Sequence, residues 1–108
     1  MTKKPPYTEG QKKLATFAKA LGHPARISIL EKLASQSCCY SGDMAEEIPI
    51  ARSTLSQHLK ELKISGLIQG EIKPPKIKYC INYKNWNEAK KLFLEIFSQT
   101  PKTNKRIC

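Results

Sequence analysis

Residues 51–66 read ARSTLSQHLKELKISG, and three leucines within them repeat at helical spacing. Leu55, Leu59 and Leu62 stand at positions i, i+4 and i+7, which places them on one face of an α-helix. Gly66 follows the last apolar position, where helices commonly end in a left-handed residue. The pattern therefore predicts a helix that fills this segment and buries one side.

The side of this predicted helix that faces away from the leucines is polar and basic. Stepping about 100° per residue, it carries Ser53, Thr54, Gln57 and Lys60, flanked by Arg52, Ser56 and Lys63. Glu61 is the first acidic residue of the helix. Small polar, amide and basic side chains can reach base edges in the major groove, and the missing acids suit a phosphate backbone. A merely solvated face normally mixes acids with bases, so DNA contact is the favoured interpretation.

The neighbouring segments carry local signals for helices and strands. Pro24 suits the first turn of a helix, and Pro49 favours a turn because it pushes Ile48 out of the helical region. Apolar and polar residues alternate over residues 76–83, as in a half-buried strand. The predicted order is helix 9–21, helix 24–34, a loop or short extended piece at 37–42, a short helix 43–47, a turn at 48–50, helix 52–65, strands 67–72 and 76–83, and a last helix capped by Asn85.

This order of elements predicts a fold. A short helix, a tight turn and a longer helix form a helix-turn-helix, and a basic hairpin directly afterwards makes it a winged one. The predicted fold class is mainly α with a β-hairpin wing, in the order α-α-α-α-β-β-α. We expect the DNA-binding domain to span residues 9–98, between a flexible arm at 1–8 and a basic tail at 99–108.

Composition favours a polyanionic partner. The 108 residues suffice for one domain with a modest core, and 19 Lys and Arg against 9 Asp and Glu give a net charge of +10. That charge favours nucleic acid. Lys73, Lys76 and Lys78 lie at or near the hairpin tip, where they could hold phosphates beside the minor groove. Edge strands also carry lysines to prevent aggregation, so these three residues indicate DNA contact only in combination with the helix-turn-helix.

Other classes of protein find little support. No apolar run is long enough to cross a bilayer, and the basic N-terminus is not followed by the apolar stretch of a secretory signal. We therefore expect a cytoplasmic protein without a membrane partner. Paired carboxylates, a phosphate-cradling glycine loop and a C-x-x-C are all missing from the sequence, so we expect no enzyme. Single-strand binding is disfavoured because Tyr79 and Tyr83 are expected on the apolar strand face.

Three segments match a known pattern. ALGHPARISILEKL (20–33), STLSQHLKELKISGLI (53–68) and KIKYCI (76–81) closely resemble the ArsR/SmtB family of winged-helix repressors, bacterial regulators that often sense metals or metalloids. The resemblance covers roughly residues 9–97 and implies a homodimer through the first and last helices. It also implies a palindromic operator read by one recognition helix per half-site. By position, it places base and phosphate contacts at Arg52, Ser53, Ser56 and Gln57.

The residues of the terminal helices independently favour a dimer. Phe17, Trp86, Phe93 and Phe97 give them more apolar face than one small core needs, although these side chains could instead pack internally. A single winged helix also contacts few bases for tight specific binding.

The chain has four cysteines, Cys38, Cys39, Cys80 and Cys108. They are too sparse for a disulfide scaffold, and a reducing compartment would keep them as thiols. The adjacent pair could bind a soft ion such as trivalent arsenic, with Cys80 or Cys108 as a third donor. Two alternatives stay open. The pair could form a disulfide with a distant cysteine in response to an oxidant or sulfur species, or it could have no sensing role.

The metal sites of the family do not map simply onto this chain. The resemblance implies a zinc site of Asp, His and Glu in the last helix, but residues 85–98 contain no His or Asp. It places a Cys-x-Cys at Tyr40 and Gly42, downstream of the cysteines present. His23 is expected at a helix start, and His58 is expected to pack or to contact phosphate rather than to bind a metal. No cofactor is expected apart from a thiophilic ion.

The sequence thus predicts a dimeric repressor that a thiol-binding inducer, such as arsenite or another soft metal, releases from a palindromic operator. A ligand that favours a dimer unable to span two half-sites must weaken DNA binding by the same coupling energy. The alternatives are a redox- or sulfur-responsive repressor of the same fold, and a non-sensing basic nucleic-acid-binding module.

Overall fold

A computed structural model describes residues 6–35, 39–41, 44–73 and 76–101. Within them the chain forms α1 (Glu9–Ala20), α2 (Pro24–Ala34), β1 (Tyr40–Ser41), α3 (Met44–Glu47), α4 (Arg52–Ser65), β2 (Ile68–Lys73), β3 (Lys76–Ile81) and α5 (Tyr83–Phe97). The predicted order of helices and hairpin strands is confirmed. The outer parts of the expected arm and tail, residues 1–5 and 102–108, lie outside the described residues.

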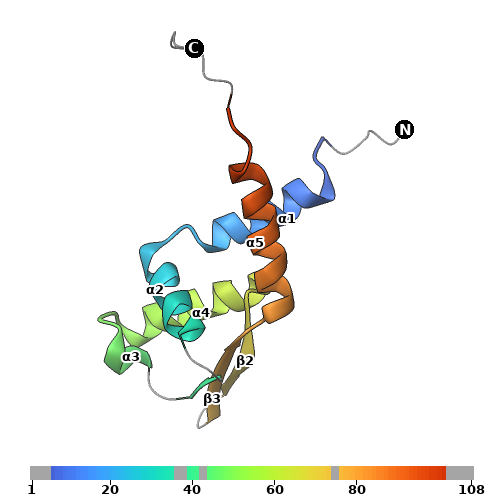
Figure 1. Ribbon diagram of the computed structural model, residues 1–108. Coiled ribbons are helices and arrows are strands. Elements are labelled where there is room, and N and C mark those ends of the chain that lie inside the picture. Colours follow the sequence, from blue (N-terminus) through green and yellow to red (C-terminus); the bar gives the residue numbers. More distant parts are fainter. Residues whose placement is uncertain (1–5, 36–38, 42–43, 74–75, 102–108) are drawn as a thin grey trace.

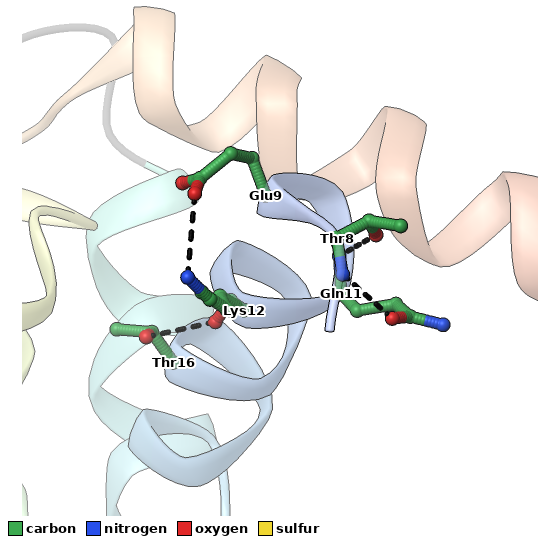
Figure 2. Close-up of polar contacts among 5 residues, drawn as sticks. All are labelled: Thr8, Glu9, Gln11, Lys12 and Thr16. Atoms are coloured by element: carbon green, nitrogen blue, oxygen red, sulfur yellow. Dashed lines mark hydrogen bonds and ion pairs between the residues drawn. The ribbon is translucent and has the colours of Figure 1, made fainter. Parts of the chain in front are cut away.

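The start of α1 is fixed by a capping box. Thr8 Oγ1 accepts a hydrogen bond from the Gln11 amide at 3.0 Å, and Gln11 Oε1 accepts one from the Thr8 amide at 2.8 Å (Figure 2). These two bonds satisfy amide groups that the first turn leaves without intrahelical partners. Within the helix, Lys12 pairs with Glu9 and its carbonyl accepts the Thr16 hydroxyl (Figure 2). α1 is thereby defined from its first residue.

α1 and α5 pack together at the end of the molecule opposite the hairpin (Figure 1). Lys13 Nζ and Glu88 Oε1 join the two helices at 2.7 Å, and this hydrogen bond with Glu88 raises the pKa of Lys13. Phe17 is buried between the helices and the core, so one of the four aromatic residues assigned to a dimer face packs internally.

The sheet has three strands in the order β1-β3-β2, and both pairings are antiparallel. β2 and β3 form the hairpin, which we call the wing. Gly70 in β2 has φ of 148°, and a Cβ there would overlap the Lys78 carbonyl oxygen. Only glycine therefore allows the two strands to approach at this point. The sequence predicted the hairpin but not that β1 would join it.

The core lies where α2 and α4 meet the sheet. Ile29, Leu62, Leu67 and Ile68 are its largest fully buried side chains. Leu55 and Leu59 are also buried, which confirms that the leucine stripe of α4 faces inward. Burial of a leucine contributes about 1.5–3 kcal/mol, so this stripe is what holds α4 on the domain.

Two predictions at the end of the wing are wrong. β3 stops at Ile81, and Tyr83 lies in α5 with 65% of its side chain exposed, so it is not on the apolar strand face. Asn82, not Asn85, caps α5, because its side chain accepts the Asn85 amide at 3.1 Å. Asn85 Nδ2 instead donates to the Gly66 carbonyl at 2.9 Å. That bond ties the end of α4 to the start of α5.

Candidate nucleic-acid interface

The helix α4 presents the predicted polar face to solvent. Its side chains proposed for DNA contact are all exposed: Arg52, Ser53, Thr54, Ser56, Gln57 and Lys60. Gln57 Nε2 donates to Glu61 Oε1 at 3.3 Å, so its amide is held along the helix by a weak bond that a base could replace. Because the leucines on the opposite side of α4 are buried in the core, this polar side of the helix must face outward.

The start of α4 is electrostatically suited to an anion. Ala51 occupies the N-cap with no side-chain cap bond, and the first turn contains no acidic residue. The amide groups of a helix start carry partial positive charge, which favours phosphate. α4 ends at Gly66, which adopts φ of 87° as the sequence predicted.

His58 anchors the middle of α4 to the domain. It is 7% exposed, and its Nδ1 accepts a hydrogen bond from Arg26 Nε at 3.1 Å. Its ring lies 4.4 Å from that of His23, which caps α2. Loss of solvent lowers the pKa of His58, and the nearby His23 and Arg26 lower it further. His58 is thus packed, which is one of the two roles the sequence predicted.

The wing lies beside the end of α4. Lys63 Nζ donates to the Gly70 carbonyl at 2.7 Å, so this lysine contacts β2, although the sequence placed it beside the DNA-reading face. Lys78 is exposed on β3. Lys73 and Lys76 pair at the turn end of the ladder, and their side chains lie outside the described part. Of the three wing lysines, Lys78 is therefore the one that the structure shows at the surface.

The cysteines are arranged differently from the predicted metal set. Cys39 and Cys80 form a disulfide, with Cα atoms 4.4 Å apart. The expectation that all cysteines stay thiols is therefore wrong for this pair. The cause is the pairing of β1 with β3, which brings the two side chains together. Cys38 and Cys108 lie outside the described residues, and the described residues contain no group of three metal-ligating side chains.

The disulfide agrees with one of the alternatives that the sequence left open, a bond between the adjacent pair and a distant cysteine. The sequence did not identify Cys80 as the partner, because β1 has only two residues and shows no periodicity. It also missed Arg26 as the partner of His58. The described helices include none long and apolar enough to span a membrane.

Comparison with known proteins places this arrangement in a family. A helix-turn-helix domain family matches residues 21–71. The regulator CmtR of Mycobacterium tuberculosis is 32% identical over 68 residues, which are 63% of this chain and 57% of CmtR. The chain thus covers less than two thirds of that relative's length. The regulator YgaV of Escherichia coli is 32% identical over 75 residues, which are 69% of this chain and 72% of YgaV. The chain belongs to the ArsR/SmtB family.

Solved structures agree with the ArsR/SmtB fold. An ArsR-like transcriptional regulator from Rhodococcus sp. RHA1 superposes with a TM-score of 0.66 at 23% identity, over 84% of each chain. HlyU from Vibrio cholerae gives 0.62 at 22% identity, over 86% of this chain and all of HlyU. The predicted winged helix-turn-helix is confirmed. The ArsR/SmtB family and fold are those of transcriptional regulators, which are not enzymes.

Proposed function

We propose that this ArsR/SmtB chain is a sequence-specific transcriptional repressor that binds double-stranded DNA in the bacterial cytoplasm. The observation that carries this proposal is the exposed, acid-free face of α4 from Arg52 to Lys60 above a buried leucine stripe. A helix of this kind fits the major groove, with Gln57 able to pair with adenine and Arg52 with guanine or phosphate. The wing would add phosphate contacts through Lys78, and through Lys73 and Lys76 near its turn.

The repressor is proposed to act as a homodimer through α1 and α5. Leu94, Ile96 and Phe97 are 57%, 48% and 78% exposed, and Phe97 stacks on Phe93 with ring centroids 6.4 Å apart. Such large apolar side chains on one helix favour a protein contact. Two recognition helices related by a two-fold axis would read a palindrome whose half-sites lie about 34 Å apart.

The proposed input is thiol chemistry at the cysteines. In the reduced protein, Cys39 and Cys80 would offer two neighbouring thiolates to arsenite or another soft metal, with Cys38 or Cys108 as a third donor. The disulfide between Cys39 and Cys80 gives specific support to the alternative, a repressor that answers to oxidants or sulfur species. A non-sensing DNA-binding module is the remaining alternative.

The proposal is tested by selecting binding sites from random duplex DNA and measuring affinity by fluorescence anisotropy. The selected sites should be palindromic and should bind much more tightly than scrambled DNA. Gln57→Ala should weaken specific binding by about 1–3 kcal/mol per contact. Gln99→Ala is the matched control, because Gln99 is exposed beyond the end of α5. Equal affinity for every duplex, or an unaffected Gln57→Ala, would refute the assignment of α4.

The inducer is tested with the selected operator. The reduced protein is titrated with arsenite, antimonite, cadmium, zinc or an oxidant, together with a variant whose Cys38 and Cys39 are both serine. We expect a thiol-reactive agent to change the affinity of the wild type and not that of the variant. A wild type insensitive to all five agents would leave the non-sensing module as the better description.

A further inference from the structure

We propose that Cys39 and Cys80 form a redox modification site that reacts with low-molecular-weight disulfides. The bond formed there restrains the wing relative to the rest of the domain and thereby raises the affinity for DNA. The inference rests on the proposed function, since it concerns the affinity of the repressor for its operator. It deepens that function by assigning the two residues, the class of co-reactant and the structural element through which oxidation acts.

The strand register creates the site. β1 and β3 pair Tyr40 with Tyr79 and Ser41 with Lys78, so the next position of the antiparallel ladder sets Cys39 opposite Cys80. Directly opposed residues in such a ladder have Cα atoms about 4.5–5.5 Å apart, close enough for a cross-strand bond. Both cysteines are partly exposed, so a small disulfide can reach them. No backbone rearrangement is required to close the bond.

The bond matters because β1 is short. A two-residue strand contributes few ladder hydrogen bonds, and isolated short strands are marginally stable in water. Tyr40 and Tyr79 are buried at 9% and 3% exposure and keep the strands near each other in either redox state. The disulfide adds a covalent link between the wing and the chain that leads into the helix-turn-helix.

On one side the link reaches the first helix of the DNA-reading unit. Tyr40 directly follows Cys39, and Glu47 ends α3. Glu47 pairs with Lys32 of α2 at 2.6 Å, and this bond, together with one to Tyr40, lowers the pKa of Glu47. The wing strand β3 is therefore connected through Cys39 and Tyr40 to α3, and through Glu47 to α2.

On the other side the wing contacts the recognition helix itself. Lys63 near the end of α4 donates to the Gly70 carbonyl of β2. The base of the wing is held by the buried side chains of Ile68, Tyr79 and Ile81. The disulfide at β3 and the Lys63 hydrogen bond at β2 add to this attachment. Reduction removes the covalent attachment and leaves the wing freer relative to α4. A less fixed wing must be ordered when it binds phosphates, which weakens binding.

The chemistry is thiol–disulfide exchange. One cysteine thiolate attacks a sulfur of the small disulfide, whose S–S bond breaks to release one small thiolate. The second cysteine thiolate then attacks the mixed disulfide, forms the Cys39–Cys80 bond and releases the second small thiolate. The two cysteines are oxidised and the small disulfide is reduced to two thiols, which take up the two protons. The reverse sequence, driven by excess small thiol, reduces the protein.

The experiment uses the full chain with Cys38→Ser and Cys108→Ser, which leaves Cys39 and Cys80 as its two cysteines. This variant is equilibrated in buffers of oxidised and reduced glutathione, and mass spectrometry measures the intramolecular disulfide. Circular dichroism confirms the fold in both states. Operator affinity is then measured at several salt concentrations. The same variant with Cys80→Ser added is the matched control that cannot form the bond.

We expect the oxidised form to bind the operator at least threefold more tightly, with a steeper salt dependence by about one phosphate contact. The Cys80→Ser control should bind equally in all buffers. A ratio below threefold, tighter binding by the reduced form, or an equal response of the control overturns the inference. If neither state prefers operator to scrambled DNA, the proposed function itself fails. If both states prefer the operator to scrambled DNA but bind the operator with equal affinity, only the redox inference is refuted.

Discussion

Reduction of the Cys39–Cys80 disulfide should lower the free energy of unfolding by about 4 kcal/mol. The bond joins residues separated by 41 positions. The chain-entropy relation assigns a loop of this size about 13 cal/mol/K, which is about 4 kcal/mol at room temperature. With a urea m-value of about 1.5 kcal/mol/M, the unfolding midpoint should fall by roughly 2–3 M. The loss arises because the reduced unfolded chain gains conformational freedom.

The measurement is urea unfolding of the Cys38→Ser, Cys108→Ser variant, oxidised and reduced, followed by circular dichroism. Protein concentration is held constant, because the stability of a dimer depends on it. The added Cys80→Ser substitution should give one midpoint in both buffers, close to that of the reduced parent. Midpoints that differ by less than about 0.5 M, with the disulfide verified by mass, would refute the loop-entropy reasoning.

Three further predictions concern the wing, the α4 anchor and the dimer. Gly70→Ala should destabilise the protein by about 2–3 kcal/mol in urea unfolding, because of its φ and its overlap with Lys78, whereas Gly10→Ala in α1 has room for the methyl group and should be neutral or stabilising. Because the pKa of His58 is lowered in the folded protein, the unfolded state binds a proton at a higher pH than the folded state does. The free energy of unfolding should therefore be full above pH 6.5 and should fall as the pH drops from 6.5 through the folded pKa. His58→Gln should reduce this loss. The groups facing His58 are His23 and Arg26, both of which oppose its protonation; an unchanged urea midpoint between pH 7.5 and 5.5 would contradict this. Phe97→Ala should weaken dimerisation in analytical ultracentrifugation by roughly tenfold, about 1.4 kcal/mol, while Ile64→Ala, which removes a 70% exposed side chain from α4, should not.

Local signals predicted α4 completely. Its leucine spacing and Gly66 are contained within one helix, so they placed both ends as the structure has them. β1 could not be predicted, because a two-residue strand exists only through its pairing with β3, which is distant in the sequence. The Cys39–Cys80 bond depends on that same pairing. Adjacent cysteines in the sequence therefore drew attention to Cys38 and Cys39 together, whereas the structure joins Cys39 to the wing.

The junction of β3 and α5 shows how competing local signals are resolved. Alternating residues continue the strand pattern through Tyr83, and both Asn82 and Asn85 are suitable caps. In the structure the Asn82 side chain accepts the Asn85 amide, so the helix starts after Asn82. The Asn85 side chain bonds to the Gly66 carbonyl, a contact 19 positions away in the sequence that local patterns do not reveal.

The polar and covalent contacts of the wing and of the helices beside it differ in kind, and this difference determines which of them can act as a switch. The Lys32–Glu47 ion pair lies at the surface, where water and salt screen it, and Lys63 reaches Gly70 through one exposed hydrogen bond. Both contacts open and close continually, and neither has a chemical state that an oxidant or a reductant could change. The disulfide is covalent, lies between partly exposed cysteines and has two chemical states. α4 is meanwhile fixed on the domain by its buried leucines and by the His58–Arg26 bond. Oxidation and reduction should therefore change the freedom of the wing while leaving the base-reading face of α4 in place, so that affinity changes and sequence preference does not.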